Sequence, residues 1–430
     1  MKRKIATYKV ENINKIKQQM LSWANQFNIC CLLDNNNYIN NHSSFEFVVA
    51  VGFQKTFTIN ASLNGYNDLK LFLEKNNDWL FGNIGYDFKN HLFSLTSNKT
   101  DHIQFPDLFL FQPEVVITLV GNFLNIQSLT KQPSSIFQEI LLTETTFTNE
   151  ENKTEIKVKP KIKKEEYIEI ISKLKNHLQM GDCYEINFCQ EFFSENTTLN
   201  PLNVYTKLNK ISPTPFGAYY KLNDKYLLCA SPERFIKKNG ENVISQPIKG
   251  TAKRDLLDFN NDEKLKNELL KSQKERSENV MIVDLVRNDL SKIANKGSVK
   301  VEEFLGLHTY PQVHQMESTI SANINSKTNL AYVLQALFPM GSMTGAPKFK
   351  VMQLIEQYEQ TKRGIYSGSL GYITPQNDFD FNVVIRSIMY NQTTKYANYL
   401  VGSAITHYSN AIDEYEECLL KAKAMELALN

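Results

Sequence analysis

Two pairs of glutamates in this chain have the spacing of a metal site. Glu275 and Glu278 are three residues apart in a long charged stretch, and Glu414 and Glu417 have the same spacing near the C-terminus. Residues three apart on a helix lie on one face. Two such faces brought together would offer the oxygen ligands that Mg²⁺ prefers. The alternative is two solvated helix faces with ordinary salt bridges, since Lys421 is placed to pair with Glu417.

A lysine that could act as a nucleophile follows an apolar stretch. Lys249 lies in the sequence QPIKGTAKR, beside Gly250. A lysine amine attacks carbon only after losing its proton, so its pKa has to fall from about 10.4 toward ~7–8. Partial burial and a nearby metal cation both act in that direction. A surface lysine at the end of a strand is the alternative interpretation.

The segment FPMGSMTGAPK, residues 338–348, could bind an anion. Its pattern predicts that it opens a helix, with the backbone N–H groups of Gly341, Ser342, Thr344 and Gly345 exposed at the helix N-terminus. No Gly-Lys-Ser/Thr sequence is present, so the segment is not a Walker motif. A structural turn without a ligand is the alternative.

Arg386, in the sequence NVVIRSIMY, is a lone charge in a run of residues suited to a buried strand. Buried arginines usually have an anionic partner. That partner is either a protein carboxylate or a carboxylate of a ligand. Combined with the groups above, this arginine would complete a site for a small dianion, with a lysine near the reacting carbon.

Patterns of apolar residues predict the elements that carry these groups. Strand-like runs in residues 160–430 alternate with helical stretches. The helices are expected at Tyr167–Met180, Asp262–Ile293, Asn329–Leu337, Phe349–Tyr358 and Asn410–Leu429. Because the strands occur in runs with helices interspersed, the pattern favours an α+β fold over a regular parallel array.

A polar and charged stretch at residues 143–166 is expected to be an exposed connection. Residues 1–145, before it, mix short apolar runs with one amphipathic stretch, which indicates strands and a few helices. The whole chain of 430 residues is long enough for one large domain or two ordinary ones.

Composition narrows the function classes further. The formal net charge is +2, which implies no nucleic-acid partner. The six cysteines have neither CxxC nor zinc-site spacing, so free thiols are expected. The basic N-terminus lacks the apolar segment of a signal peptide, and no apolar run approaches the roughly 18 residues of a membrane span. We therefore expect a cytoplasmic protein with no membrane partner.

The motifs resemble those of the chorismate-utilising enzymes, a family that includes anthranilate, aminodeoxychorismate, isochorismate and salicylate synthases. The resemblance is strongest from about Gly181 to Ala424. It rests on SPERF (231–235), PIKGT (247–251), ENVMIVDLVRNDL (278–290), GSMTGAPK (341–348), RGIYSGSLGY (363–372) and DEYEECLLKA (413–422). Residues 1–145 are a looser match and would form an N-terminal segment like that of anthranilate synthase component I, followed by a chorismate-binding catalytic domain at 160–430. The implied fold is a four-layer α/β/β/α arrangement with two facing, largely antiparallel sheets.

The resemblance also implies roles for individual residues. Mg²⁺ would be held by Glu278 and Glu417, with Glu275 and Glu414 acting through metal-bound water, and it would bind the ring carboxylate of chorismate. Glu233, in SPERF, matches the general acid and base at the C4 hydroxyl. The remaining predicted contacts are to the second carboxylate and the rest of the substrate: Arg386, Tyr366, Gly402, Ser403, Gly341, Ser342, Thr344 and Lys421.

Lys249, in PIKGT, separates members of the family. Aminodeoxychorismate synthases usually have Lys there, and the others named above usually have Ala. The resemblance therefore implies that Lys249 attacks C2 as the C4 hydroxyl leaves, after which ammonia enters at C4 and expels the lysine. The product would be 4-amino-4-deoxychorismate, a precursor of para-aminobenzoate and folate. The sequence has no Gly-x-Cys-x-Gly glutaminase motif, so ammonia is expected from a separate glutamine amidotransferase subunit in a heterodimer.

Two alternatives stay open. The first is anthranilate synthase component I, which forms anthranilate and pyruvate. In that enzyme a His linked to pyruvate elimination occupies the position of Gln315, whereas His314 lies one residue earlier and should point elsewhere in a strand. Ala404 also replaces a Gly of the family near the enolpyruvyl site. The second alternative is a non-catalytic relative that senses an amino acid or binds a partner.

Overall fold

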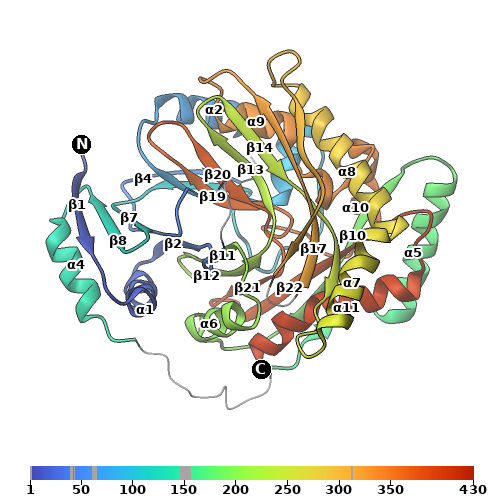
Figure 1. Ribbon diagram of the computed structural model, residues 1–430, viewed down its shortest axis with the longest axis horizontal. Helices are drawn as coiled ribbons and strands as arrows, with labels where there is room; N and C mark the ends of the chain where they lie inside the picture. The colour runs from blue at the N-terminus through green and yellow to red at the C-terminus, as the bar shows by residue number, and fades with distance from the viewer. Residues whose placement is uncertain (1, 39–41, 43, 61–64, 146–155, 311–312) are drawn as a thin grey trace.

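The structure is a computed structural model that describes residues 2–38, 42, 44–60, 65–145, 156–310 and 313–430. Two large antiparallel sheets form its centre, and helices cover them (Figure 1). This is the α+β arrangement predicted from the sequence. Part of the expected connection, residues 146–155, lies outside the described residues.

The larger sheet has 12 strands among the described residues. In spatial order they are β1 (Lys4–Lys9), β8 (Phe123–Ser128), β7 (Val115–Val120), β3 (Phe47–Val51), β2 (Ile29–Asp34), β11 (Phe216–Leu222), β12 (Lys225–Ser231), β21 (Ser387–Asn391), β22 (Tyr396–Ile405), β10 (Glu185–Ser194) and β18 (Gly345–Ala346), with β9 (Lys159–Pro160) also paired to β10. The strand β10 is buried along almost its whole length, although its sequence EINFCQEFFS includes two glutamates.

The smaller sheet has 10 strands in the described part of the chain. Their order is β15 (Ile248–Lys253), β17 (Val313–Asn323), β14 (Asn242–Gln246), β13 (Arg234–Asn239), β20 (Phe379–Asn382), β19 (Ser369–Ile373), β5 (Leu80–Ile84), β6 (Leu108–Gln112) and β4 (Lys55–Ile59), with β16 (Lys300–Thr309) also paired to β17. Strands from both sides of residue 145 pair in each sheet, as β2 does with β11 and β5 with β19.

Helices cover the outer face of each sheet. On the larger sheet lie α1 (Ile13–Ala24), α4 (Pro133–Leu142), α5 (Lys164–Gln179), α6 (Pro201–Ile211), α10 (Lys348–Tyr358) and α11 (Ala411–Leu429). On the smaller sheet lie α2 (Gly65–Lys75), α7 (Phe259–Lys271), α8 (Gln273–Ser291) and α9 (Leu330–Leu337). The short α3 (Lys89–Phe93) and the 3₁₀ turns η1 (Tyr86–Phe88) and η2 (Gly341–Met343) are connections.

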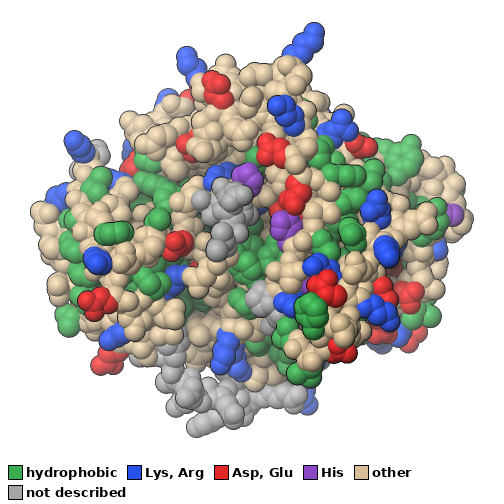
Figure 2. Space-filling view, viewed as in Figure 1, with side chains coloured by type: hydrophobic (Ala, Val, Ile, Leu, Met, Phe, Trp, Pro, Cys, Tyr) green, Lys and Arg blue, Asp and Glu red, His purple; other side chains and the backbone are tan. Residues whose placement is uncertain are grey.

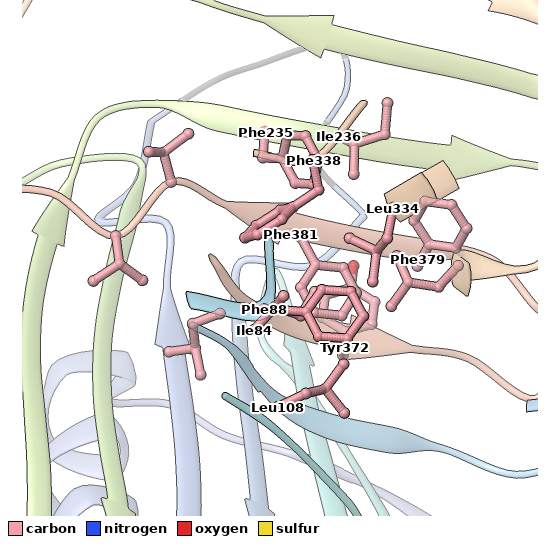
Figure 3. Close-up of a cluster of buried hydrophobic side chains, with 14 of the residues drawn as sticks. Ile84, Phe88, Leu108, Phe235, Ile236, Leu334, Phe338, Tyr372, Phe379 and Phe381 are labelled. Atoms are coloured by element: carbon pink, nitrogen blue, oxygen red, sulfur yellow. The ribbon is translucent and has the colours of Figure 1, made fainter. Parts of the chain in front are cut away.

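The inner core lies where the two sheets face each other, and aromatic side chains fill much of it. Phe88, Phe235, Phe338 and Phe381 come from distant parts of the sequence and cluster in Figure 3. Phe338 makes edge contacts with Phe88 and Phe235. Burial of such large apolar surfaces is the main favourable term in folding, so this core holds the sheets in a fixed relation.

The expected long helix at residues 262–293 is wrong in one respect, because it is two helices. The chain leaves α7 after Lys271, and Ser272 takes extended backbone angles as the N-cap of α8. Its hydroxyl accepts a hydrogen bond from the backbone N–H of Glu275 at 3.3 Å. Ser followed three residues later by Glu is the signature of a capping box, and such a cap favours a new helix start over continuation.

The surface and the cysteines agree with the sequence analysis. Charged side chains of both signs are interspersed over the face in Figure 2. The six cysteines are buried and free. None of the described helices is long and apolar enough to cross a membrane.

A buried ion pair joins three elements next to the core. Arg363 donates to the carboxylate of Glu359 through Nε at 2.9 Å, and also to the carbonyl oxygens of Met343 at 2.7 Å and Asn187 at 2.8 Å. The Glu359 carboxylate accepts in turn from the backbone N–H of Cys189. Both charges are almost fully buried, so the pair fixes η2 and β10 relative to the end of α10.

Glu359→Gln should therefore destabilise the protein by about 3–5 kcal/mol, because it leaves the charge of Arg363 buried without its counter-ion. Urea unfolding monitored by circular dichroism measures this change. Glu169→Gln, which breaks an exposed pair with Lys173 on α5, is the control and should leave the unfolding midpoint unchanged. A loss below about 1 kcal/mol in Glu359→Gln would contradict the assignment.

Candidate active site

The two glutamate pairs meet where the first turns of α8 and α11 approach each other. Lys274 bridges the helices, with its Nζ 2.8 Å from Glu414 Oε1 and 3.7 Å from Glu417 Oε2. Lys421 on α11 pairs with Glu417 at 2.7 Å, the salt bridge that the spacing predicted. The structure therefore brings the two carboxylate faces together, with the Lys274 ammonium in contact with Glu414 and Glu417.

Burial leaves one oxygen of this cluster without a partner. Glu278 is 5% exposed, and its Oε1 has no hydrogen bond to any residue that the structure describes. Burial raises the pKa of Glu278 to about 8, against the attraction of Lys249. Burial also raises the pKa of Glu275, with Lys274 opposing it. An unsatisfied buried oxygen among further carboxylates suits a hard divalent cation, so the donor set fits Mg²⁺.

Lys249 points into the interior from β15 and forms a buried ion pair that sequence reasoning missed. Its Nζ donates to Glu185 Oε1 at 2.7 Å. Burial alone would lower the pKa of Lys249, but the carboxylates of Glu185, Glu278 and Glu233 outweigh it and raise that pKa above its ordinary value. This is opposite to the sequence-based expectation, which left out the acidic neighbours.

Glu233 lies between β12 and β13 and is almost fully buried. Its carboxylate accepts a hydrogen bond from Ser342 Oγ at 2.6 Å. Burial raises the pKa of Glu233 to about 7, although Ser342 and Lys249 both act to lower it. A carboxyl group with this pKa exchanges protons near neutral pH, as a general acid and base must.

Arg386 does not lie within a strand, which corrects the sequence-based expectation. It occupies the crossing between β20 of the smaller sheet and β21 of the larger one, with φ at +50°. The chain has to leave one sheet for the other here, so extended geometry is interrupted. Its guanidinium makes no hydrogen bond or ion pair with any described residue, while Glu233 attracts it.

A cavity beside Arg386 contains a second unsatisfied group. Its lining includes Pro232, Tyr310, Gln315 and Arg386. Gln315 is 1% exposed, and neither its amide oxygen nor its amide nitrogen has a partner in the described part of the chain. An unsatisfied buried amide facing an unpaired guanidinium marks a place for a polar ligand.

His314 faces away from this cavity, as its position beside Gln315 on a strand predicted. Its Nε2 lies 3.0 Å from Asp262 Oδ1 on α7, and its Nδ1 lies 3.0 Å from Thr309 Oγ1. This histidine therefore connects β17 to α7 and does not reach the candidate site.

Gly402 and Ser403, which were predicted near the second carboxylate, belong to β22. The Ser403 hydroxyl donates to Glu414, and Lys421 donates to the carbonyl oxygen of Gly402 at 3.0 Å. A Cβ at Gly402 would lie 2.4 Å from the side-chain oxygen of Asn187 on β10, so a larger residue would displace that side chain. Tyr366 is buried, and its hydroxyl lies 3.8 Å from the Sγ of Cys189, which is a residue of β10.

The segment around Gly341 does not open a helix, contrary to the prediction. Gly341–Met343 form the 3₁₀ turn η2, and α10 starts only at Lys348, after β18 and Pro347. Within this turn the N–H of Thr344 donates to the carbonyl oxygen of Gly341, and Thr344 Oγ1 donates to that of Met340. The turn contributes the Ser342 hydroxyl to Glu233, so its clearest contribution to the site is a side chain.

Sequence reasoning missed Glu185 and Lys274, although each carried a signal. Glu185 is a charged residue at the start of a strand that also contains large apolar residues, the same kind of exception that singled out Arg386. Lys274 stands directly before Glu275. The assembled site contains a buried amine, a carboxyl group poised near neutral pH and a carboxylate cluster. Such a site can displace a hydroxyl group from an anionic substrate.

Two curated relatives each match about three fifths of the chain. Aminodeoxychorismate synthase component 1 of Bacillus subtilis (strain 168) is 35% identical over 263 residues, which is 61% of this chain and 55% of that protein. Anthranilate synthase component 1 of Aquifex aeolicus is 35% identical over 266 residues, 62% of this chain and 53% of that protein. The matched regions thus span about half the length of these relatives.

A solved structure and a family comparison cover almost the whole chain. Anthranilate synthase component I from Streptococcus pneumoniae superimposes with a TM-score of 0.79 at 22% identity, over 91% of this chain and 95% of that one, and so shares the fold. Residues 30–426 match the family described as chorismate binding enzyme, and this protein therefore belongs to that family.

Proposed function

We propose that this protein aminates chorismate at C4 with ammonia and forms 4-amino-4-deoxychorismate. The observation that carries the proposal is the buried amine of Lys249, which shares a cluster of charges with Glu233. The names of relatives such as the Bacillus subtilis protein support it. A covalent route to amination requires an amine that can reach the reacting carbon.

The chain's own residues account for both halves of the reaction. The neutral amine of Lys249 forms a bond to ring C2, the ring double bonds shift, and the C4–O bond breaks. Glu233 gives its proton to the departing hydroxyl, which leaves as water. Ammonia then bonds to C4, the double bonds shift back and the lysine amine leaves C2. Two displacements in sequence replace one difficult displacement.

We also propose that Glu278 and Glu417 hold Mg²⁺, with Glu275 and Glu414 next to it. When bound, the ion would attract and orient the ring carboxylate of chorismate. Arg386 is the candidate partner of the second carboxylate, because its guanidinium has no partner among the described residues.

Ammonia is proposed to come from a separate glutamine amidotransferase subunit. The Bacillus subtilis and Aquifex aeolicus relatives both bear the designation component 1, which fits a role as one part of a two-component enzyme. The sequence of this chain contains no Gly-x-Cys-x-Gly nucleophile motif of its own.

The product assay tests the proposal directly. Chorismate, ammonia and Mg²⁺ should give 4-amino-4-deoxychorismate, identified by mass spectrometry, without release of pyruvate. Fluorescent anthranilate with an equal amount of pyruvate would instead show an anthranilate synthase, which the similarity to the Aquifex aeolicus protein makes the second candidate.

Lys249→Ala should lower turnover by several orders of magnitude, as loss of a covalent nucleophile does. Intact-mass spectrometry without ammonia should find wild-type protein carrying chorismate minus water, and the variant without it. Lys253→Ala removes an exposed lysine from the same strand and should keep both the turnover and the adduct. An adduct in Lys249→Ala would refute the assigned nucleophile.

Adduct formation without ammonia should also depend on pH through Glu233. This residue must be protonated to release the hydroxyl, so the rate should fall as pH rises above about 7, the pKa of Glu233. Ser342 donates to the carboxylate and lowers that pKa, so Ser342→Ala should raise it and move the alkaline limb to higher pH by up to roughly one unit. A shift toward lower pH would contradict this role.

Mg²⁺ should raise the melting temperature of the protein, because a ligand that binds only the folded state stabilises it. Glu278→Gln should abolish the increase, which differential scanning fluorimetry measures. Glu416→Gln changes an exposed neighbour of Glu417 on α11 and should keep the increase. An equal increase in the Glu278 variant would place the metal elsewhere.

A further inference from the structure

We propose that Glu185 accepts the proton that Lys249 must lose before it attacks, and returns that proton when the amine is expelled. The inference rests on the proposed function, in which Lys249 is the nucleophile. It assigns a catalytic role to a residue that touches the reacting nitrogen directly.

The contact between the two side chains has the geometry of proton transfer. Lys249 Nζ lies 2.7 Å from Glu185 Oε1. Glu185 is 0% exposed, and Lys249 is 8% exposed, so bulk water does not separate the two groups. The second oxygen, Oε2, is buried without a hydrogen-bond partner in the described part of the chain.

The backbone holds Glu185 firmly in this place. Glu185 is the first residue of β10 and pairs with Ala346 of β18. A Cβ on the adjoining Gly345 would lie 2.0 Å from the carbonyl oxygen of Glu185, and Gly345 has φ at +138°. Only glycine permits this close approach, so the pairing fixes the start of β10 and with it the direction of the carboxylate.

The other acidic groups around Lys249 have different tasks. Glu278 and Glu275 approach from α8 and Glu417 from α11, and all three belong to the proposed metal cluster. Glu233 has to hold a proton for the leaving hydroxyl. In the described part of the chain, Glu185 alone among these carboxylates lies within hydrogen-bond distance of the Lys249 amine, and no other task requires it to hold a proton.

The surrounding charges make such an acceptor necessary. The acidic neighbours raise the pKa of Lys249, so neutral solution would leave the amine protonated. Transfer to Glu185 turns an ammonium and a carboxylate into a neutral amine and a carboxylic acid. This exchange becomes easier when a bound substrate excludes water. A site of low dielectric disfavours the two charged groups relative to the two neutral ones.

Protons and electrons balance over the cycle. Glu185 takes one proton from the ammonium, and the nitrogen lone pair forms the bond to C2 while Glu233 releases its proton to the C4 oxygen. After ammonia bonds to C4, the C2–N bond breaks and its electrons stay on the lysine nitrogen. Glu185 then returns its proton to the amine, and Glu233 regains one from the new ammonium at C4.

Glu185→Gln tests the role because it keeps the shape and loses the basicity. Adduct formation and turnover should fall roughly 10²–10⁴-fold, the usual effect of losing a general base. The rate at which acetic anhydride acylates Lys249 in the absence of substrate, measured by peptide mass spectrometry across pH, should instead rise at neutral pH. The pKa of Lys249 should fall in the variant, because the anion of Glu185 has gone.

Two further variants separate this role from a structural one. Glu185→Ala leaves space that formate can fill, so added formate should restore part of the turnover. Glu191→Gln changes another buried glutamate of β10, which binds Tyr396 and Asn398 away from Lys249, and should leave turnover and the Lys249 pKa unchanged.

Full turnover in Glu185→Gln, or no rescue of Glu185→Ala by formate, would overturn the inference. Failure of the proposed function gives a different result, since the wild-type protein would then form no 4-amino-4-deoxychorismate and no adduct on Lys249.

Discussion

An excess of buried negative charge is the constraint on which this site depends. The site gathers six carboxylates and four cationic side chains, so full ionisation leaves two negative charges uncompensated. The acids are Glu185, Glu233, Glu275, Glu278, Glu414 and Glu417, and the bases are Lys249, Lys274, Lys421 and Arg386. Burial of the carboxyl groups raises the pKa values of Glu233 and Glu278 toward neutrality, which lessens that excess. A dianionic substrate would add to the excess, and a divalent cation would offset it.

The two sheets supply the partners of this charge network from opposite sides. Lys249 belongs to β15, the edge strand of the smaller sheet, whereas Glu185 belongs to β10, next to the edge of the larger sheet. Their ion pair therefore joins the sheets where strand pairing ends. The aromatic core around Phe338 sets the distance between the sheets, and the Arg363–Glu359 pair fixes β10 relative to η2. Packing remote from the chemistry thus places an amine and a carboxylate within one hydrogen bond of each other.

The match over residues 30–426 shows the family, whereas the reaction is a proposal that depends on individual residues. A solved structure named as an anthranilate synthase component I shares this fold, so the fold alone does not separate amination from other outcomes. The proposed function draws the distinction from Lys249 and Gln315. Lys249 carries the proposed nucleophile, and Gln315 presents a buried amide to the cavity beside Arg386.

Several features of the site followed from the sequence alone. The shared face of Glu275 and Glu278 requires only one local helix. The opposite side-chain directions of His314 and Gln315 require only one strand, so local periodicity was sufficient for both. The order of the motifs indicated the family, and the composition indicated free cysteines and a balanced charge.

Other features required the tertiary structure, because they join residues far apart in the chain. Glu185 is 64 residues from Lys249, and no local pattern links them. The pKa of Lys249 was expected to fall because burial and a metal cation were considered without the acids that β10 and α8 bring to it. Arg386 was expected in a strand, but its place depends on where the chain crosses between sheets. Local sequence thus determined which side chains each element carries, whereas the packing of the elements decided which charges meet and hence their protonation.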